Sequence, residues 1–275
     1  MLGTDLVALL RSDGELNVSS ADLGEIDITD EASVEQCFDA ARPDVAINCA
    51  AFTKVDACET HENEAYAVNA LGPGILATTC ARHGIRLVHI STDYVFDGEK
   101  KTPYLPSDAP NPINAYGRTK LAGEEAVAAN CRDHLIVRTE WLYGAHGKNF
   151  VGAILRLAKE KDELGVVADQ FGSPTYTVDL AAVLRELALS RATGITHATS
   201  SGSCSWYEFA CEIVKLAGPA TPVRPISSSD YPTPARRPTN SALDCSRTES
   251  ITGVKMRDWR EALADFLRDE SRPQR

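Results

Sequence analysis

The sequence has no long hydrophobic run and no excess of positive charge. Its longest apolar stretch near the N-terminus covers only residues 6–10, which is too short for the core of a signal peptide or for a membrane-spanning helix. The formal net charge is −11, so nucleic acids and anionic membrane surfaces are unfavourable general partners. We therefore expect a cytoplasmic protein that binds neither, although a phosphorylated small ligand would need only local donors.

Patterns that bind metals or build a disulfide framework are also missing. The eight cysteines include no Cys-x-x-Cys pair, and the six histidines form no His-Glu-x-x-His cluster. Several cysteines lie within apolar runs, so reduced core thiols are the expected state. We assign no metal ligand, and a magnesium requirement cannot be read from this sequence.

The first half of the chain alternates helical patterns with short apolar runs. Its 275 residues, 43% of them hydrophobic, can form a large core in one or two domains. We expect strands at 44–49, 86–90 and 134–139 with a weak one at 16–19, and helices at 2–10, 30–41 (capped by Thr29 or Asp30, with Ser33 as a competitor), 63–83 with an interruption at 72–74, and from Asn114 or Tyr116 to 130. Continuous apolar runs are typical of a parallel sheet covered on both faces. The pattern predicts an α/β fold with a doubly wound parallel sheet.

The second half has more loops. We expect helices at 151–164, 179–190, 206–217 and 258–269, a short strand at 165–168, and a loop at 169–177. Residues 218–240 hold six prolines and many serines, which indicates a long loop or lid. We therefore predict a first domain over residues 1–147 and a smaller one over 148–275, with some of its segments returning to the sheet.

One stretch, residues 91–120, combines groups that suit proton transfer. Ser91 and Thr92 follow an apolar run, so they are expected at the carboxyl end of a strand, where α/β sheets bind ligands. Tyr116 and Lys120 are four residues apart and share one helix face. We expect the ammonium group to lower the Tyr116 pKa from roughly 10 toward the working pH, as a general acid–base requires. A Thr92 hydroxyl could then hold a carbonyl oxygen against the phenol.

Seven short motifs in order resemble those of the extended short-chain dehydrogenases/reductases, and among them the dTDP-4-dehydrorhamnose reductase family. The resemblance covers nearly the whole chain. The motifs are Asp27-Ile28-Thr29-Asp30; Asn48-Cys49-Ala50-Ala51-Phe52-Thr53 with Asp56; Ser91-Thr92-Asp93-Tyr94-Val95-Phe96-Asp97-Gly98; Tyr116-Gly117-Arg118-Thr119-Lys120; Arg138-Thr139-Glu140-Trp141-Leu142-Tyr143-Gly144; Gly172-Ser173-Pro174-Thr175; and Arg237-Pro238. This resemblance implies a Rossmann-type sheet that binds NADPH or NADH.

The resemblance also implies a role for each matching residue. Tyr116 would be the general acid, Lys120 would hold the nicotinamide ribose, and Thr92 would bond the 4-keto oxygen of a dTDP-linked sugar. Asp93 and Trp141 would line the sugar pocket, and Arg237 would face the nucleotide phosphates. Among the remaining cofactor contacts, Gly3 would belong to the glycine turn at the pyrophosphate, and Asp27 and Ile28 would border the adenine. Ala50, Ala51, Phe52 and Thr53 would lie along the middle of the cofactor.

Several of these residues also have simpler structural interpretations. Asp27 could cap a helix, Trp141 could be a core aromatic residue, and Arg237 could form a solvated pair with Arg236. Asp22, near the end of the weak strand, could accept the adenosine ribose hydroxyls, which would favour NADH; family members can also use NADPH, so both cofactors stay open. A homodimer is compatible with the resemblance.

The chain departs from the family pattern at its start. Members begin with a strand and a Gly-x-x-Gly-x-x-Gly turn, whose third glycine corresponds to Gly3. The strand and the first two glycines are absent from the given sequence, and their loss would leave unpaired strand edges and remove part of the phosphate cradle. We expect the start codon to have been assigned late, at an internal methionine.

The implied reaction is reduction of dTDP-4-dehydro-L-rhamnose to dTDP-L-rhamnose, a precursor of surface polysaccharide. Two other classes are considered. A nucleotide-sugar dehydratase of the superfamily would carry Asp-Glu after the strand-end threonine, whereas here Asp93-Tyr94 follows Thr92. A non-catalytic regulator similar to the methionine adenosyltransferase beta subunit is the stronger rival, but it would not need the Thr92, Tyr116 and Lys120 set.

Overall fold

The centre of the molecule is a four-stranded parallel sheet in the order β1-β2-β3-β8. The computed structural model describes residues 1–218 and 220–270. The strands of this sheet are β1 (Val45–Asn48), β2 (Arg86–Thr92), β3 (His134–Thr139) and β8 (Gly194–His197). This arrangement confirms the predicted α/β class and the three strong strand predictions.

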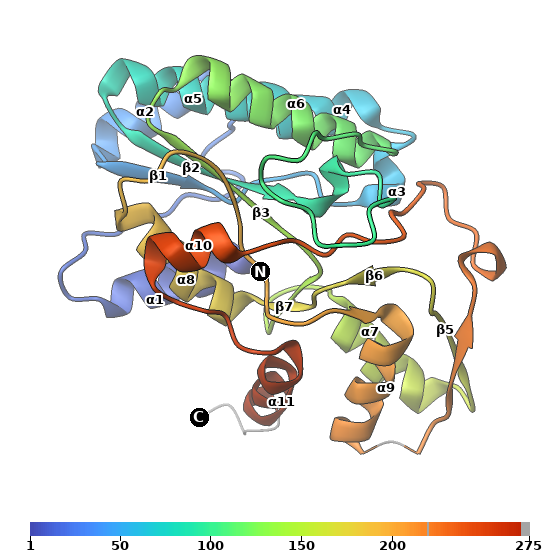
Figure 1. The fold of residues 1–275 in the computed structure, drawn as a ribbon. Helices are drawn as coiled ribbons and strands as arrows, with labels where there is room; N and C mark the ends of the chain where they lie inside the picture. The colour runs from blue at the N-terminus through green and yellow to red at the C-terminus, as the bar shows by residue number, and fades with distance from the viewer. Residues whose placement is uncertain (219, 271–275) are drawn as a thin grey trace.

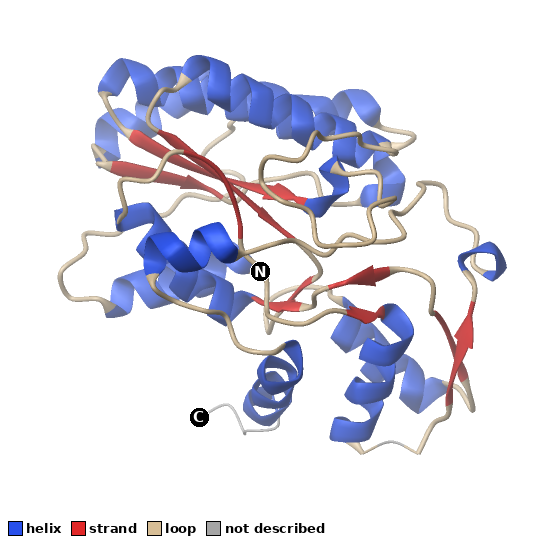
Figure 2. Cartoon of the chain, in the orientation of Figure 1, coloured by secondary structure: helices blue, strands red, loops and turns tan. Residues whose placement is uncertain are grey.

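Helices cover both faces of the sheet (Figures 1 and 2). On the upper face in Figure 1 lie α2 (Glu31–Ala41), α5 (Gly72–His83) and α6 (Ala115–Asn130); on the lower face lie α1 (Leu2–Ser12), α8 (Thr177–Leu189) and α10 (Ser246–Thr252). Neighbouring strand residues point to opposite layers: Leu87 packs in the upper cluster and Val88 in the lower one. This two-sided burial explains why the strands are continuous apolar runs.

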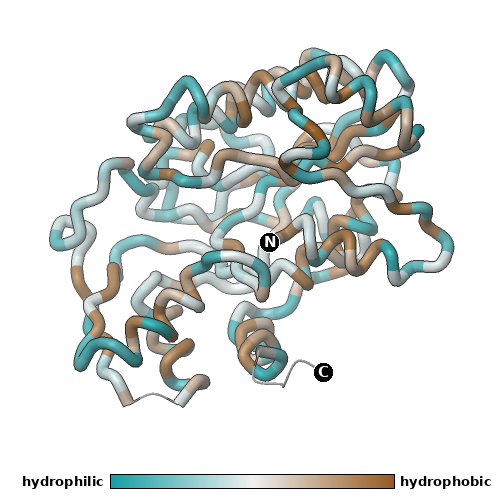
Figure 3. Tube along the Cα trace, turned by 180° about the vertical axis from the view of Figure 1, so that it is seen from behind, coloured by the Kyte–Doolittle hydropathy of each residue, from teal (hydrophilic) through white to brown (hydrophobic). Residues whose placement is uncertain are grey.

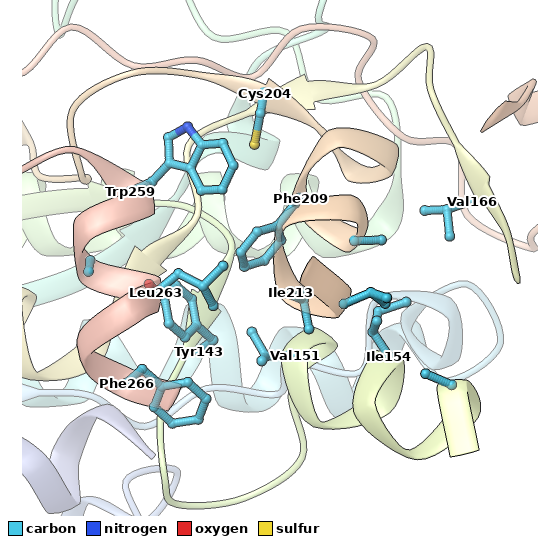
Figure 4. Close-up of a cluster of buried hydrophobic side chains, with 14 of the residues drawn as sticks. Tyr143, Val151, Ile154, Val166, Cys204, Phe209, Ile213, Trp259, Leu263 and Phe266 are labelled. Carbon is cyan, nitrogen blue, oxygen red and sulfur yellow. The ribbon is translucent and has the colours of Figure 1, made fainter. Parts of the chain in front are cut away.

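A third apolar cluster lies beyond the carboxyl ends of the strands. It brings together α7 (Phe150–Glu160), α9 (Trp206–Ala217) and α11 (Trp259–Glu270). Figure 4 shows the Phe209 ring of α9 facing Trp259 of α11, and the Phe266 ring of α11 beside Tyr143. Hydrophobic and hydrophilic stretches alternate along the helices (Figure 3), as expected for helices that bury one side.

Short elements connect these layers. They are α3 (Val55–Cys58), α4 (Glu62–Tyr66), the π-helical turn η1 (Ala67–Leu71), the 3-10 turns η2 (Asp93–Val95) and η3 (Ser228–Asp230), and the paired strands β4 (Leu142–Tyr143) with β7 (Thr175–Tyr176), β5 (Leu164–Val167) with β10 (Val223–Ile226), and β6 (Phe171–Gly172) with β9 (Cys204–Ser205). Because β8, α8 and α10 belong to the sheet layers, the C-terminal half contributes to both parts. The division between residues 147 and 148 stays a prediction.

Four local predictions differ from the structure. Residues 16–19 form no strand, because no neighbouring strand in the described chain pairs with them; β1 is likewise paired only with β2. The chain stays helical through residues 72–74, since η1 precedes Pro73 and places it in the first turn of α5, where its missing N–H costs little. Helix α7 ends at Glu160 rather than 164, and the expected loops at 169–177 and 218–240 contain β6, β7, β10 and η3.

Candidate active site

The carboxyl end of β2 carries two side chains that bond to each other. Thr92 is the last residue of the strand and caps η2, where its Oγ1 accepts from the Tyr94 backbone N–H over 3.2 Å. The same hydroxyl donates to Asp93 Oδ1 over 2.9 Å. Both side chains are buried. A polar pair is therefore fixed at the sheet edge where α/β proteins bind ligands.

Helix α6 brings Tyr116 to this strand end. Asn114 caps the helix by accepting from the Gly117 N–H over 2.8 Å, and its amide donates to the Arg236 carbonyl over 2.8 Å. The helix itself begins at Ala115, between the two starts that the sequence left open. The Tyr116 ring packs edge-to-face on Tyr94, with 5.5 Å between centroids. The Thr92 hydroxyl lies close enough to the phenol to lower its pKa. The structure therefore places the strand-end hydroxyl near Tyr116, and their joint role toward a carbonyl oxygen stays a prediction.

The electrostatics around Tyr116 differ from the expected ones. Burial, followed by repulsion from Asp93, raises the Tyr116 pKa above its ordinary value, while the bond with Thr92 acts in the opposite direction. The expectation that Lys120 lowers this pKa is therefore wrong for the protein alone. Tyr116 is a neutral phenol at neutral pH, which is the form that can donate a proton.

Lys120 is directed at the strand backbone. Its Nζ donates to the Ile90 carbonyl oxygen over 2.7 Å and lies 3.4 Å from His89 Nε2. Burial lowers the pKa of Lys120 to about 8, while Glu124 acts to raise it. Sequence reasoning missed His89, which bonds Asn48 over 3.1 Å on its other side and so links Lys120 to β1.

The segment after β1 is partly exposed and lies beside the start of α1. Ala50 and Thr53 are exposed, Ala51 and Phe52 are half-buried, and Gly3 in α1 lies beside Cys49 with 3.7 Å left to a Cβ built on the glycine. No side chain caps the N-terminus of α1, so its first N–H groups are available to an anion. Asn69, which sequence reasoning also missed, holds Phe52 through two backbone bonds and reaches Thr119 on α6.

The residues expected near the adenine make local contacts. Asp27 accepts from the N–H and the hydroxyl of Thr29, while Asp30 is the residue that caps α2. Ile28 covers Gly72, where an added Cβ would come within 2.7 Å of it. Asp22 is exposed on the loop between α1 and α2, and no strand precedes it. Their roles toward a cofactor stay predictions.

Trp141 and Arg237 are both engaged by other side chains. The Trp141 ring stacks on Trp206 with 3.4 Å between centroids, and its backbone has a φ of 48°, which is unusual for a residue other than glycine. Arg237 binds Asp56 through two hydrogen bonds of 2.5 and 2.9 Å. The structure therefore shows a packed tryptophan and an ion-paired arginine, and their roles toward a sugar and a phosphate stay predictions.

A buried carboxyl that sequence reasoning did not select lies next to Asp93. Glu140 directly follows β3, and the Ser241 hydroxyl donates to its Oε2 over 2.8 Å. Both carboxyls are only 2% exposed. Burial raises the pKa of Asp93 to about 7, and burial together with Asp93 raises that of Glu140 well above its ordinary value. Its position at a strand end was the available sequence signal.

Gly117 has a contact that no other residue type could make. A Cβ at this position would lie 2.1 Å from the Tyr94 carbonyl oxygen, whereas one at Gly152 would lie 3.8 Å from its nearest neighbour. Both glycines donate to a capping asparagine three residues earlier.

Gly117→Ala is expected to displace Tyr116 and to cost about 1–3 kcal/mol of stability, measured by urea unfolding. Gly152→Ala is the matched control and should be neutral or stabilising; equal effects would contradict the close approach of α6 to Tyr94.

Outside this site, the described residues hold one group with the geometry of metal ligands. It consists of Glu35, Asp39 and His83 on the surfaces of α2 and α5. Glu35 is already bonded to Arg82 and His83. No helix in the described ranges is both long and apolar enough to cross a membrane.

Comparison with known proteins gives matches over almost the full chain. Residues 1–272 match the family model described as RmlD substrate binding domain. The dTDP-4-keto-6-deoxy-D-glucose reductase of Streptomyces niveus is 45% identical over 96% of this chain and 92% of its own. The relative of Mycobacterium tuberculosis that is named dTDP-4-dehydrorhamnose reductase is 44% identical over 97% of this chain and 89% of its own.

Solved structures agree in fold. A dTDP-4-dehydrorhamnose reductase of Clostridium acetobutylicum superposes with a TM-score of 0.95 at 42% identity, covering 98% of this chain and 96% of the other. The Bacillus anthracis enzyme, solved in complex with NADP, has a TM-score of 0.92 at 38% identity, with 96% and 95% covered.

Proposed function

This chain belongs to the dTDP-4-dehydrorhamnose reductase family, and from that premise we propose that it reduces the 4-keto group of dTDP-4-dehydro-L-rhamnose to give dTDP-L-rhamnose. Such a product serves nucleotide-sugar pathways that build surface polysaccharide. The observation that carries the proposal is the position of the Tyr116 phenol, at the start of α6, near the Thr92 hydroxyl at the end of β2. Two hydroxyls at this position can hold one carbonyl oxygen between them.

Reduced nicotinamide supplies the hydride when it is bound. Thr92 and Tyr116 orient the keto oxygen, and Tyr116 gives its proton to the alkoxide that forms at C4. The raised pKa of Tyr116 keeps the phenol protonated before the reaction, and an alkoxide is basic enough to take that proton. Asp93 accepts a hydrogen bond from Thr92 and so fixes the orientation of that hydroxyl.

In the proposed site, Lys120 can form further hydrogen bonds, and Arg237 can exchange the hydrogen bonds that it forms now. Lys120 has one strong bond, to the Ile90 carbonyl, so its other protons are available to ribose hydroxyls. Arg237 is bound to Asp56 on both terminal nitrogens, so binding a nucleotide diphosphate would require at least one of these bonds to be replaced. The exposed Asp22 carboxylate would accept adenosine ribose hydroxyls and repel the 2′-phosphate of NADPH; NADH and NADPH are therefore both tested.

The substrate preference is identified by comparing the rates at which two keto sugars are reduced. Since one relative at 45% identity is named for dTDP-4-keto-6-deoxy-D-glucose, kcat/KM should be measured for this sugar and for dTDP-4-dehydro-L-rhamnose, with each cofactor. We expect at least about tenfold preference for the rhamnose-type sugar, equivalent to about 1.4 kcal/mol of differential transition-state binding. The reverse preference would assign the other reaction. Capture of a partner enzyme without any turnover would favour a regulatory subunit.

A further inference from the structure

Asp93 and Glu140 form a buried acid pair next to the proposed proton donor. The register of the sheet brings them together: Thr92 of β2 is paired with Thr139 of β3, and each carboxyl is on the next residue. Ser241 lies near both of them, because its hydroxyl donates to Glu140 Oε2 over 2.8 Å and is close enough to Asp93 to lower the pKa of that carboxyl. Three segments far apart in sequence thus build one cluster.

The pair has no cation to balance it. Among the described residues, no lysine or arginine forms an ion pair with either carboxyl. The titratable groups that act on the cluster are Tyr94 and Tyr116 near Asp93, and the thiols of Cys204 and Cys245 near Glu140. One oxygen of each carboxyl, Asp93 Oδ2 and Glu140 Oε1, is buried without a hydrogen-bond partner. Ionisation of both carboxyls would place two negative charges close together in a buried site, which is unfavourable. The arrangement therefore favours a state in which one of the two carboxyls keeps its proton.

Thr92 lies between this pair and Tyr116. Its Oγ1 donates to Asp93 Oδ1 over 2.9 Å, and its hydroxyl is close enough to the Tyr116 phenol to lower the pKa of that group. A hydroxyl can accept a proton on one side while it releases its own on the other. We propose that Asp93 and Glu140 share one proton and return it, through the Thr92 hydroxyl, to Tyr116 after each turnover.

This inference rests on the proposed reduction, in which Tyr116 loses one proton to the alkoxide. The O–H bond of the shared carboxylic acid breaks, Thr92 Oγ1 takes that proton, and the proton that Thr92 carried passes to the Tyr116 phenolate. The carboxyl pair is then doubly ionised until solvent supplies another proton. No electrons move in this step. Glu140 is therefore a positioning and proton-storing residue that does not touch the substrate.

The test separates the first turnover from later ones. The enzyme loaded with NADPH is mixed rapidly with keto sugar, and oxidation of NADPH is followed for wild type and Glu140→Gln. Since Tyr116 begins protonated, the first turnover of the variant should proceed at the wild-type rate, with one NADPH oxidised per site. Its steady-state rate should then fall by about tenfold or more. Glu208→Gln, which alters an exposed capping carboxylate on α9, is the control and should match wild type in both phases.

Ser241→Ala provides an independent variant, because it removes the hydroxyl near both carboxyls. Its first turnover should proceed at the wild-type rate, and its steady-state rate should fall, but by less than that of Glu140→Gln. A variant that merely folds less well would lose the first and later turnovers in equal proportion, so thermal unfolding is measured alongside. Because Glu140→Gln removes a buried uncompensated carboxyl, this variant should be at least as stable as wild type.

Equal steady-state rates in all proteins would overturn the relay and leave the reductase intact. No NADPH oxidation by wild type would overturn both.

The pH profile supplies a second readout. In wild type, the steady-state rate should fall as pH rises through the range in which the pair loses its proton, near the Asp93 pKa of about 7 or above it. In Glu140→Gln the fall should move to lower pH, because Asp93 alone holds a proton less tightly than the pair. An unchanged profile would contradict the shared proton.

Discussion

Tyr116→Phe is expected to lower kcat by about 10²–10⁴-fold, because it removes the proton donor from the proposed reduction. The phenylalanine ring keeps the contact with Tyr94 and the position of α6, since only the hydroxyl is lost. Cofactor affinity, measured by fluorescence titration, should therefore change little. The hydroxyl of Thr92 remains, so some polarisation of the keto oxygen should persist.

The matched control is Tyr94→Phe, because its ring packs against Tyr116 but its hydroxyl contacts Arg237 rather than Thr92. It should retain most of the turnover rate. If Tyr116→Phe turned over nearly as fast as wild type, Tyr116 could not be the general acid, whatever the fate of the family assignment.

Arg138→Met is expected to have the largest effect on stability. Arg138 and Glu124 form a bidentate ion pair, with bonds of 2.8 and 2.6 Å, and their side chains are 1% and 3% exposed. Removing only the cation leaves a buried carboxylate without its partner, which costs about 3–5 kcal/mol. The free energy of unfolding, from urea titration, should fall by this amount.

Two further variants show whether the loss comes from the orphaned charge. Glu124→Leu combined with Arg138→Met removes both charges and should recover much of the lost stability. Arg156→Met breaks an exposed pair with Glu160, whose side chains are 61% and 53% exposed, and should change stability by less than about 1 kcal/mol. If Arg138→Met were as mild as Arg156→Met, the pair would not hold the core. Because Ser91 also donates to Glu124, this pair ties β3 and α6 to the end of β2.

The catalytic candidates were predictable because their signals are local. Thr92 follows an apolar run, and Tyr116 and Lys120 share one helix face after a capping asparagine, so a strand end and a helix start could be recognised in sequence. The class of the sheet was predictable for the same reason. The ends of helices were harder to predict. One predicted helix extended to Leu164, whereas α7 ends at Glu160 and Leu164 belongs to β5.

The rest depended on contacts between distant segments. The raised pKa of Tyr116 comes from burial and from Asp93, and neither could be judged from the spacing of Tyr116 and Lys120. Glu140 reaches Asp93 only because of the register between β2 and β3, which no local pattern specifies. Asp56 meets Arg237 across 181 positions of sequence. Long-range pairing of this kind decides which polar groups are free and which are neutralised.

The most direct measurement of the central claim follows the hydride itself. The protein would be given dTDP-4-dehydro-L-rhamnose with NADPH or NADH deuterated at the transferable position of the nicotinamide. One deuterium is expected at C4 of dTDP-L-rhamnose for each cofactor oxidised, detected by mass spectrometry and NMR. If cofactor bound but no deuterium reached the sugar, the protein would not be a reductase of this substrate.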